Sequence, residues 1–244
     1  MLTAKKAISQ TVSILGRALT VSDQMAVVKN SGVDRETKDV IRQCLIAAMN
    51  YESTSKESLE KSKTMVRKIK EECEISSRTA AFTAASALKL KKWKDVDEML
   101  EYADYSPPVI SRSINISSLA QQSKLDEALN ELEKVLMTEE SIFSTENYCI
   151  SDEALDSLCE AIKSCPDSTE KMKRFRNLQR MITKYNRRTP KTIDDLLFSA
   201  LRVEVVKYEE IDDKAKAFVD SEQFETFVRK APYLVDQPID KKIE

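Results

Sequence analysis

A helical pattern that recurs after 32 positions constrains the fold of this chain more than any other feature. Apolar residues with helical spacing follow Trp93-Lys94-Asp95-Val96, and the same spacing follows Leu125-Asp126-Glu127-Ala128. Paired helices that recur at periods of about 30 to 40 residues are typical of α-solenoids, which bind other molecules. The pattern therefore predicts an all-α fold, an α-solenoid of stacked helix-turn-helix repeats with a C-terminal helical cap.

The chain has no histidine and only two glycines, which removes several kinds of active site. Without histidine, the usual general base and the commonest metal ligand are missing. Two separate glycines, Gly16 and Gly32, form neither a Walker A loop nor a dinucleotide-binding fingerprint. Adjacent acids such as Asp194-Asp195 point about 100° apart on a helix, so they do not form a catalytic pair. We therefore expect no enzyme activity, no cofactor, no metal and no small-molecule substrate.

Net charge, cysteine spacing and hydropathy narrow the partners and the compartment. The formal net charge is −2, so any attraction to nucleic acid must come from local patches. The five cysteines include no C-x-x-C pair, which favours free thiols in a reducing compartment over disulfides or a metal site. No apolar run approaches the ~20 residues that cross a membrane, so the sequence predicts no membrane span.

Apolar periodicity divides most of the chain into predicted helices. Three helical-hairpin repeats are predicted over residues 34–138, and Pro107-Pro108 separates the second from the third. The predicted turns within the hairpins are Ser53-Thr54-Ser55, Lys91-Lys92-Trp93-Lys94 with Asp95 as the cap of the next helix, and Gln121-Gln122-Ser123.

The C-terminal helical region is predicted over residues 139–235, after the repeats. It begins with a linker, and an aromatic and acidic cap follows its last helix. Residues 236–244 are expected to be a flexible tail. The predicted helices of this region cover residues 151–164, 168–185 and 192–208.

Residues 1–33 form a predicted N-terminal amphipathic segment with two interpretations. Lys5, Lys6 and Arg17 occur among the first 22 residues without any acid. A basic, acid-poor amphipathic helix is typical of a mitochondrial presequence, and the alternative is the second helix of a truncated repeat. The apolar residues expected on one helical face are Ile8, Val12, Leu15 and Leu19.

The densest group of cations lies in a predicted basic helix over residues 168–188, with no acid between Glu170 and Asp194. Phe175, Leu178, Ile182 and Tyr185 are expected on the opposite face. Such a surface suits phosphate binding, and the alternative is a solvated face balanced by the acidic C-terminus. The candidate RNA-binding cations are Lys171, Lys173, Arg174, Arg176, Arg180, Lys184, Arg187 and Arg188.

Two further basic clusters have weaker claims to a ligand. Trp93 lies among Lys89, Lys91, Lys92 and Lys94, where an indole ring is able to stack a base, although closure of the hairpin core is the favoured interpretation. The stretch from Lys61 to Lys70 alternates with glutamates, which predicts ion pairs on an exposed helix.

The hairpins resemble pentatricopeptide repeats. Val28-Lys29-Asn30-Ser31-Gly32-Val33 resembles the closing segment of such a repeat. More specifically, residues 24–200 resemble the C-terminal part of the mitochondrial family of pentatricopeptide repeat-containing protein 2. The segments that carry this resemblance, in the same order, are Ile75-Ser76-Ser77-Arg78 through Ala85-Ser86-Ala87-Leu88, Ile150-Ser151-Asp152-Glu153-Ala154-Leu155 and Thr192-Ile193-Asp194-Asp195-Leu196-Leu197.

The resemblance implies a non-enzymatic role in maturation of mitochondrial RNA, in the matrix, with single-stranded RNA as partner. Each repeat reads about one base near the start of its first helix, where Arg42, Thr83 and Asn115 are the nearest polar candidates. Three repeats do not specify a transcript alone. The alternative is a helical-repeat adaptor that binds another protein without RNA contact, with a cytoplasmic location as the alternative to the matrix.

Overall fold

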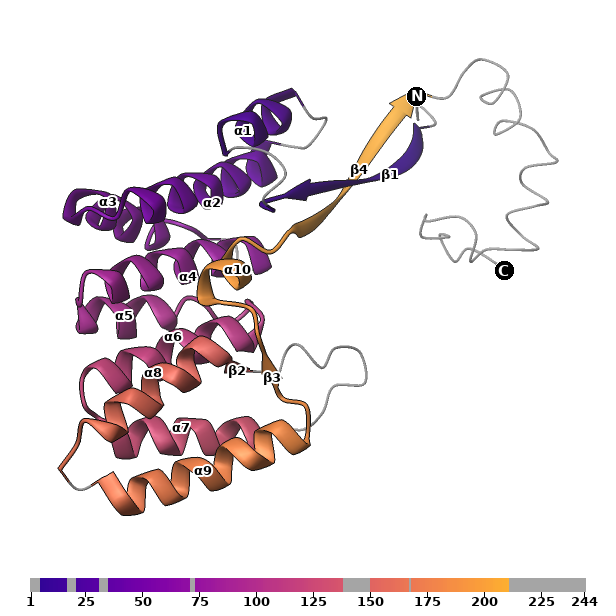
Figure 1. The fold of residues 1–244 in the computed structure, drawn as a ribbon. Coiled ribbons are helices and arrows are strands. Elements are labelled where there is room, and N and C mark those ends of the chain that lie inside the picture. The colour runs from indigo at the N-terminus through magenta and orange to yellow at the C-terminus, as the bar shows by residue number, and fades with distance from the viewer. Residues whose placement is uncertain are drawn as a thin grey trace, which may run out of the picture. The chain divides into compact units, whose positions relative to one another are not determined.

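The computed structural model describes residues 5–16, 21–30, 35–70, 73–137, 150–166 and 168–210 (Figure 1). The described part is mostly helical, with ten helices and two small two-stranded sheets. The predicted helical class is therefore confirmed. The chain divides into a smaller unit, Met1–Val12 with Val203–Glu244, and a larger unit, Ser13–Arg202. The predicted linker over residues 138–150 lies outside the described residues except for Ile150, which begins a short strand. The aromatic cap beyond residue 210 and the flexible tail also lie outside the described residues.

Strands, rather than the predicted helices, occupy the described residues of the smaller unit. Strand β1 (Lys5–Ile14) pairs with strand β4 (Leu201–Glu210). The helix predicted over residues 1–22 and the end of the helix predicted over 192–208 are therefore wrong. Apolar Leu201, Val203 and Val205 alternate with charged residues, and this period of two, with β-branched valines, favours a strand.

Helical hairpins make up most of the larger unit. Helix α1 (Val21–Asn30) precedes them, and α10 (Ile193–Leu197) is a single short turn of helix after them. The paired helices are α2 (Arg35–Ser53) with α3 (Lys56–Val66), α4 (Glu74–Lys89) with α5 (Trp93–Leu100), α6 (Pro108–Gln121) with α7 (Leu125–Met137), and α8 (Asp152–Lys163) with α9 (Ser168–Lys184).

Local sequence accounts for most of the helix ends. The Ser55 side chain accepts a hydrogen bond from the backbone N–H of Ser58 and caps α3, and Pro108 is the first residue of α6. The prediction that Asp95 caps α5 is wrong, since that helix begins at Trp93 with Lys92 before it. Instead, the Asp95 carboxylate pairs with Lys63 Nζ at 2.8 Å and ties α5 to α3.

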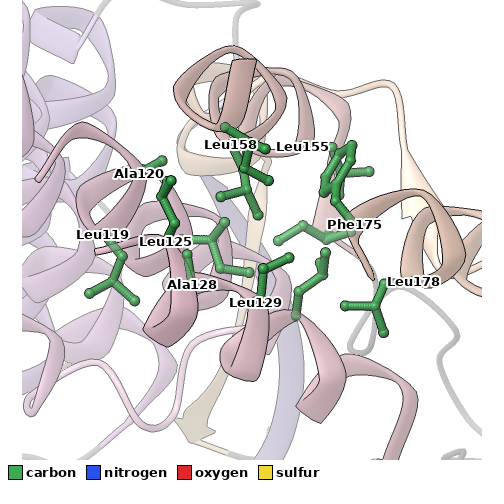
Figure 2. Packing of buried hydrophobic residues seen from close by; sticks show 14 of the residues in the cluster. Leu119, Ala120, Leu125, Ala128, Leu129, Leu155, Leu158, Phe175 and Leu178 are labelled. Atoms are coloured by element: carbon green, nitrogen blue, oxygen red, sulfur yellow. The ribbon is translucent and has the colours of Figure 1, made fainter. Parts of the chain in front are cut away.

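The first helices of successive hairpins pack against one another. Helix α4 contacts α2 and α6, α6 contacts α8, and α7 contacts α9 (Figure 1). Every residue of α4 from Ser76 to Leu88 is buried, because neighbouring helices surround it. One hydrophobic cluster joins α6, α7, α8 and α9, and it includes Leu129, Leu155 and Phe175 (Figure 2). This burial places α9 firmly against α7 and α8.

The chain turns back after α9 and runs across the ends of the preceding helices (Figure 1). We call residues 187–199 the strap. Its strand β3 (Arg188–Thr189) pairs in parallel with β2 (Ile150–Ser151), and α10 contacts α6 and α4. Arg78 Nη1 of α4 donates hydrogen bonds to the carbonyl oxygens of Leu196 and Leu197 at 2.9 and 2.8 Å. The strap therefore connects the last hairpin to the second.

Candidate nucleic-acid interface

Helix α9 has an apolar face that fixes it on the protein core. Phe175, Leu178 and Ile182 are buried in the cluster shared with α7 and α8, as the sequence predicts. This spacing of three and four residues keeps one stripe of the helix in contact with its neighbours. The remaining residues of α9 are consequently held in a fixed orientation toward α7 or toward solvent.

The flank of α9 that faces α7 carries neutralised cations. Lys171 Nζ lies 2.5 Å from Asp126 Oδ2 of α7. Arg174 Nη2 lies 3.0 Å from Glu133 Oε1 and donates a hydrogen bond to Asn130 Oδ1 at 2.8 Å. These two predicted RNA contacts are therefore already paired with acids and amides of the neighbouring helix, and they connect α9 to α7.

The outward side of α9 carries four exposed cations, Lys173, Arg176, Arg180 and Lys184. We call these residues the outer face of α9. Their spacing of three, four and four residues places them along one side of the helix, over about 16 Å. None of them forms an ion pair or hydrogen bond with any residue that the structure describes. The outer face is thus a row of uncompensated positive charge on a rigid support.

Two of the predicted RNA contacts have structural roles in the strap. The Arg187 side chain is buried, and its Nη1 donates hydrogen bonds to the carbonyl oxygens of Val135 at 2.6 Å and Leu136 at 3.3 Å. A cation stabilises the end of a helix in this way. Arg188 Nε donates to Asp152 Oδ1 at 2.8 Å, which raises the pKa of Arg188. The prediction that Arg187 belongs to an exposed basic surface is wrong.

The candidates on the hairpins do not join this surface. Thr83 is fully buried, and its Oγ1 donates to the carbonyl oxygen of Thr79, so its hydroxyl is not exposed to a base in this structure. Helix α4 is in contact with α2, α3, α5, α6 and α10. Arg42 is exposed on α2, and Trp93 and Asn115 are half-buried on α5 and α6. Helix α9 packs instead against α7 and α8.

A hollow beside the outer face extends it toward α7. It has a volume of about 520 Å³ and opens next to Lys173 and Asn177 of α9. Its mixed lining of cations, acids and an amide is able to make hydrogen bonds with a polar ligand. The lining residues are Asp126, Leu129, Glu170, Lys171, Lys173, Arg174 and Asn177.

Tyr185 is the surface residue that the sequence pattern misplaced. The pattern put it on the apolar face with Phe175, but its side chain is 49% exposed. Helix α9 ends at Lys184, and Asn186 turns the chain with a φ of 53°, so Tyr185 has no following helical turn to cover it. Met181, one turn earlier, is 38% exposed. The sequence signal for the exposure of Tyr185 was that the helical pattern ends before Pro190.

Two groups in the interior, Cys44 and Tyr51, have raised pKa values. Burial raises the pKa of the Cys44 thiol from 9.0 to about 12. Burial and a hydrogen bond to Asp194 raise the pKa of Tyr51 above its usual value. Both groups are thereby held in their neutral forms near the contact between α2 and α4, where they contribute to packing.

Metal ligands, membrane spans and relatives add no constraint on the site. Across the described ranges, no three His, Cys, Asp or Glu side chains gather closely enough to hold a metal ion. None of the helices in those ranges combines the length and the apolar character that crossing a membrane requires. No protein-family model, curated protein or solved structure matches the chain.

Proposed function

We propose that this chain is a non-enzymatic helical-repeat protein that binds single-stranded RNA through the outer face of α9. In this proposal the hairpins form a short α-solenoid of the pentatricopeptide kind, and the protein takes part in maturation of mitochondrial RNA. The observation that carries the proposal is the row formed by Lys173, Arg176, Arg180 and Lys184, which no described acid neutralises. The resemblance of the hairpins to pentatricopeptide repeats supplies the biological setting.

The packing of the helices supports the solenoid part of the proposal. Helices α2, α4, α6 and α8 contact one another in sequence, and each is followed by a partner helix that closes its hairpin. Stacked hairpins bury the apolar faces that a single hairpin leaves open. Helices α8 and α9 share a hydrophobic cluster with α6 and α7, so in this proposal they form a fourth hairpin of the same kind.

The electrostatics of α9 support polyanion binding with little sequence preference. Phosphate contacts by Lys and Arg release counterions from a nucleic acid and supply affinity that does not depend on base sequence. Thr83, the base-reading candidate on α4, is buried inside the fold. In our proposal the outer face therefore docks the RNA, and a partner contributes the choice of transcript.

A salt titration of RNA binding tests the proposal. The probe is a single-stranded oligouridylate, and the variant replaces the four outer-face cations, K173Q, R176Q, R180Q and K184Q. We expect affinity to fall steeply with salt for the native chain. Because each phosphate contact on a single strand adds about 0.7 to the log–log slope, the variant should flatten that slope by about 3.

A matched control removes the same charge from scattered exposed positions outside α9. Its substitutions are K56Q, K68Q, K124Q and K163Q. We expect this control to keep most of the native slope, since its cations do not share one face. Absence of RNA binding at low salt, or an equal loss in both variants, contradicts the proposal.

A protein-binding adaptor without RNA contact is the second candidate, and a specific hollow favours it. Tyr102 and Tyr105 are 46% and 55% exposed beside a hollow of about 350 Å³ that Val66 and Ile69 also line. Exposed aromatic side chains next to apolar ones are common in protein interfaces. The same titration separates the candidates, because an adaptor of this kind does not bind the oligouridylate at low salt.

A further inference from the structure

We infer that Tyr185 and Met181 stack RNA bases next to the outer face of α9, and that this contact makes the site selective for single-stranded RNA over duplex RNA. This inference rests on the proposed function and specifies its ligand. It concerns two side chains that the charge pattern does not include, and it follows from where α9 ends.

The apolar side chains lie at the end of the row of cations. Lys184 Nζ is 5.6 Å from the centroid of the Tyr185 ring. Met181 comes one residue after Arg180 and one turn before Tyr185, and both apolar residues are substantially exposed. Most large apolar side chains in the described part of the larger unit are buried, so two exposed ones beside uncompensated cations are unusual.

The backbone holds Tyr185 in place while its ring remains open to solvent. Its N–H donates to the carbonyl oxygen of Met181 at 3.0 Å, which continues the helical pattern by one residue. The N–H of Arg187 donates to the carbonyl oxygen of Ile182 at 2.9 Å, and the buried Arg187 side chain anchors the next turn. A ring on such a fixed base loses little conformational freedom when a ligand covers it.

Stacking on this ring requires an unpaired base. Aromatic side chains bind the faces of bases in single strands, and Lys or Arg side chains hold the adjacent phosphates. In a duplex the base faces are already stacked on their neighbours, so the ring gains no equivalent contact. Lys184 lies within the ~6 Å range of a cation–π contact with Tyr185, which places a phosphate-binding group next to the stacking surface.

Binding assays with three probes test this inference. The probes are a single-stranded RNA of about 12 nucleotides, a duplex of the same length, and polyphosphate, which has no bases. For Y185A we expect about tenfold weaker binding of the single strand, since one stacked base contributes about that factor. Binding of the duplex and of polyphosphate should be unchanged, because the cations remain.

Two further variants separate stacking from structural damage. Y185F keeps the ring and should bind the single strand as the native chain does, whereas M181A should lose less than Y185A because a thioether covers less of a base. The inference is wrong if Y185A binds the single strand as tightly as the native chain does. It is also wrong if Y185A weakens polyphosphate binding as much as it weakens single-strand binding. In that case the proposed function still stands, provided that the four-cation variant binds RNA more weakly than the native chain does. If the native chain binds none of the probes, both fail together.

Discussion

Arg78 and Arg180 are the same residue type, yet their surroundings in the larger unit are opposite. Arg78 is 1% exposed, and its Nη1 donates hydrogen bonds to the carbonyl oxygens of Leu196 and Leu197 in the strap. Arg180 extends from the outer face of α9 with no described partner. The comparison teaches that the number of cations in a segment does not determine its role. What matters is whether the fold supplies acceptors for them.

The largest expected effect comes from removing the interior arginine. R78L removes the guanidinium that donates to the carbonyl oxygens of Leu196 and Leu197, and we expect it to lower the free energy of unfolding by about 3–5 kcal/mol. R180L should change that free energy by less than about 0.5 kcal/mol while it weakens RNA binding. Urea denaturation followed by circular dichroism measures both. Equal stability of the two variants would break the comparison.

An intermediate effect is expected from alkaline pH, which acts on the buried thiol of Cys44. The raised pKa of Cys44 means that the folded chain keeps its proton up to about pH 12, whereas the unfolded thiol loses it above about pH 9. Stability from this group is therefore fully present below pH 9 and is lost as the pH rises toward 12. By linkage we expect the free energy of unfolding to fall by about 1.4 kcal/mol between pH 8 and pH 10.

The C44A variant is the control for this pH dependence. It lacks the titrating thiol, so its stability should fall less steeply over the same interval. Tyr51 has the same sign, because its raised pKa also favours the protonated form in the folded chain, and its contribution begins above pH 10. A native chain and a C44A chain with parallel stability curves would show that Cys44 is not shielded as its burial implies.

The smallest effect is expected from releasing two cations that are paired with acids, one on α3 and one at its C-terminal end. On α3, Lys61 Nζ lies 2.8 Å from Glu57 Oε1, and Arg67 Nη2 lies 2.6 Å from Glu98 Oε1 of α5. The E57Q and E98Q double variant releases these two cations without adding any. We expect a gain of a few-fold in RNA affinity at low salt, with a stability change below about 1 kcal/mol. A loss of affinity would contradict the role that we assign to uncompensated cations.

Local patterns in the sequence were sufficient for the helices of the hairpins, including the basic helix α9. The periodic apolar residues Phe175, Leu178 and Ile182 identified the buried side of α9 correctly. The turn at Gln121-Gln122-Ser123 and the start of α6 at Pro108 were also predicted. These features depend on residues a few positions apart, where capping and periodicity act directly.

Contacts between distant residues account for several of the errors. Arg187 is buried because it meets the carbonyl oxygen of Val135, 52 positions earlier, and no local pattern specifies that partner. Strands β1 and β4 lie near opposite ends of the chain, so their pairing is equally hidden from a local reading. Thr83 was assigned from repeat register alone, whereas burial of the whole helix around it depends on five other helices.

The strap also has a consequence for how the larger unit folds and unfolds. In a linear array of repeats, each hairpin meets only its neighbours, so the ends can unravel one hairpin at a time. The contact between Arg78 and Leu196 joins residues 118 positions apart and closes the intervening hairpins into a loop. Closing such a loop slows folding, since distant segments must meet first. Once it is closed, we expect the enclosed hairpins to unfold as one cooperative block.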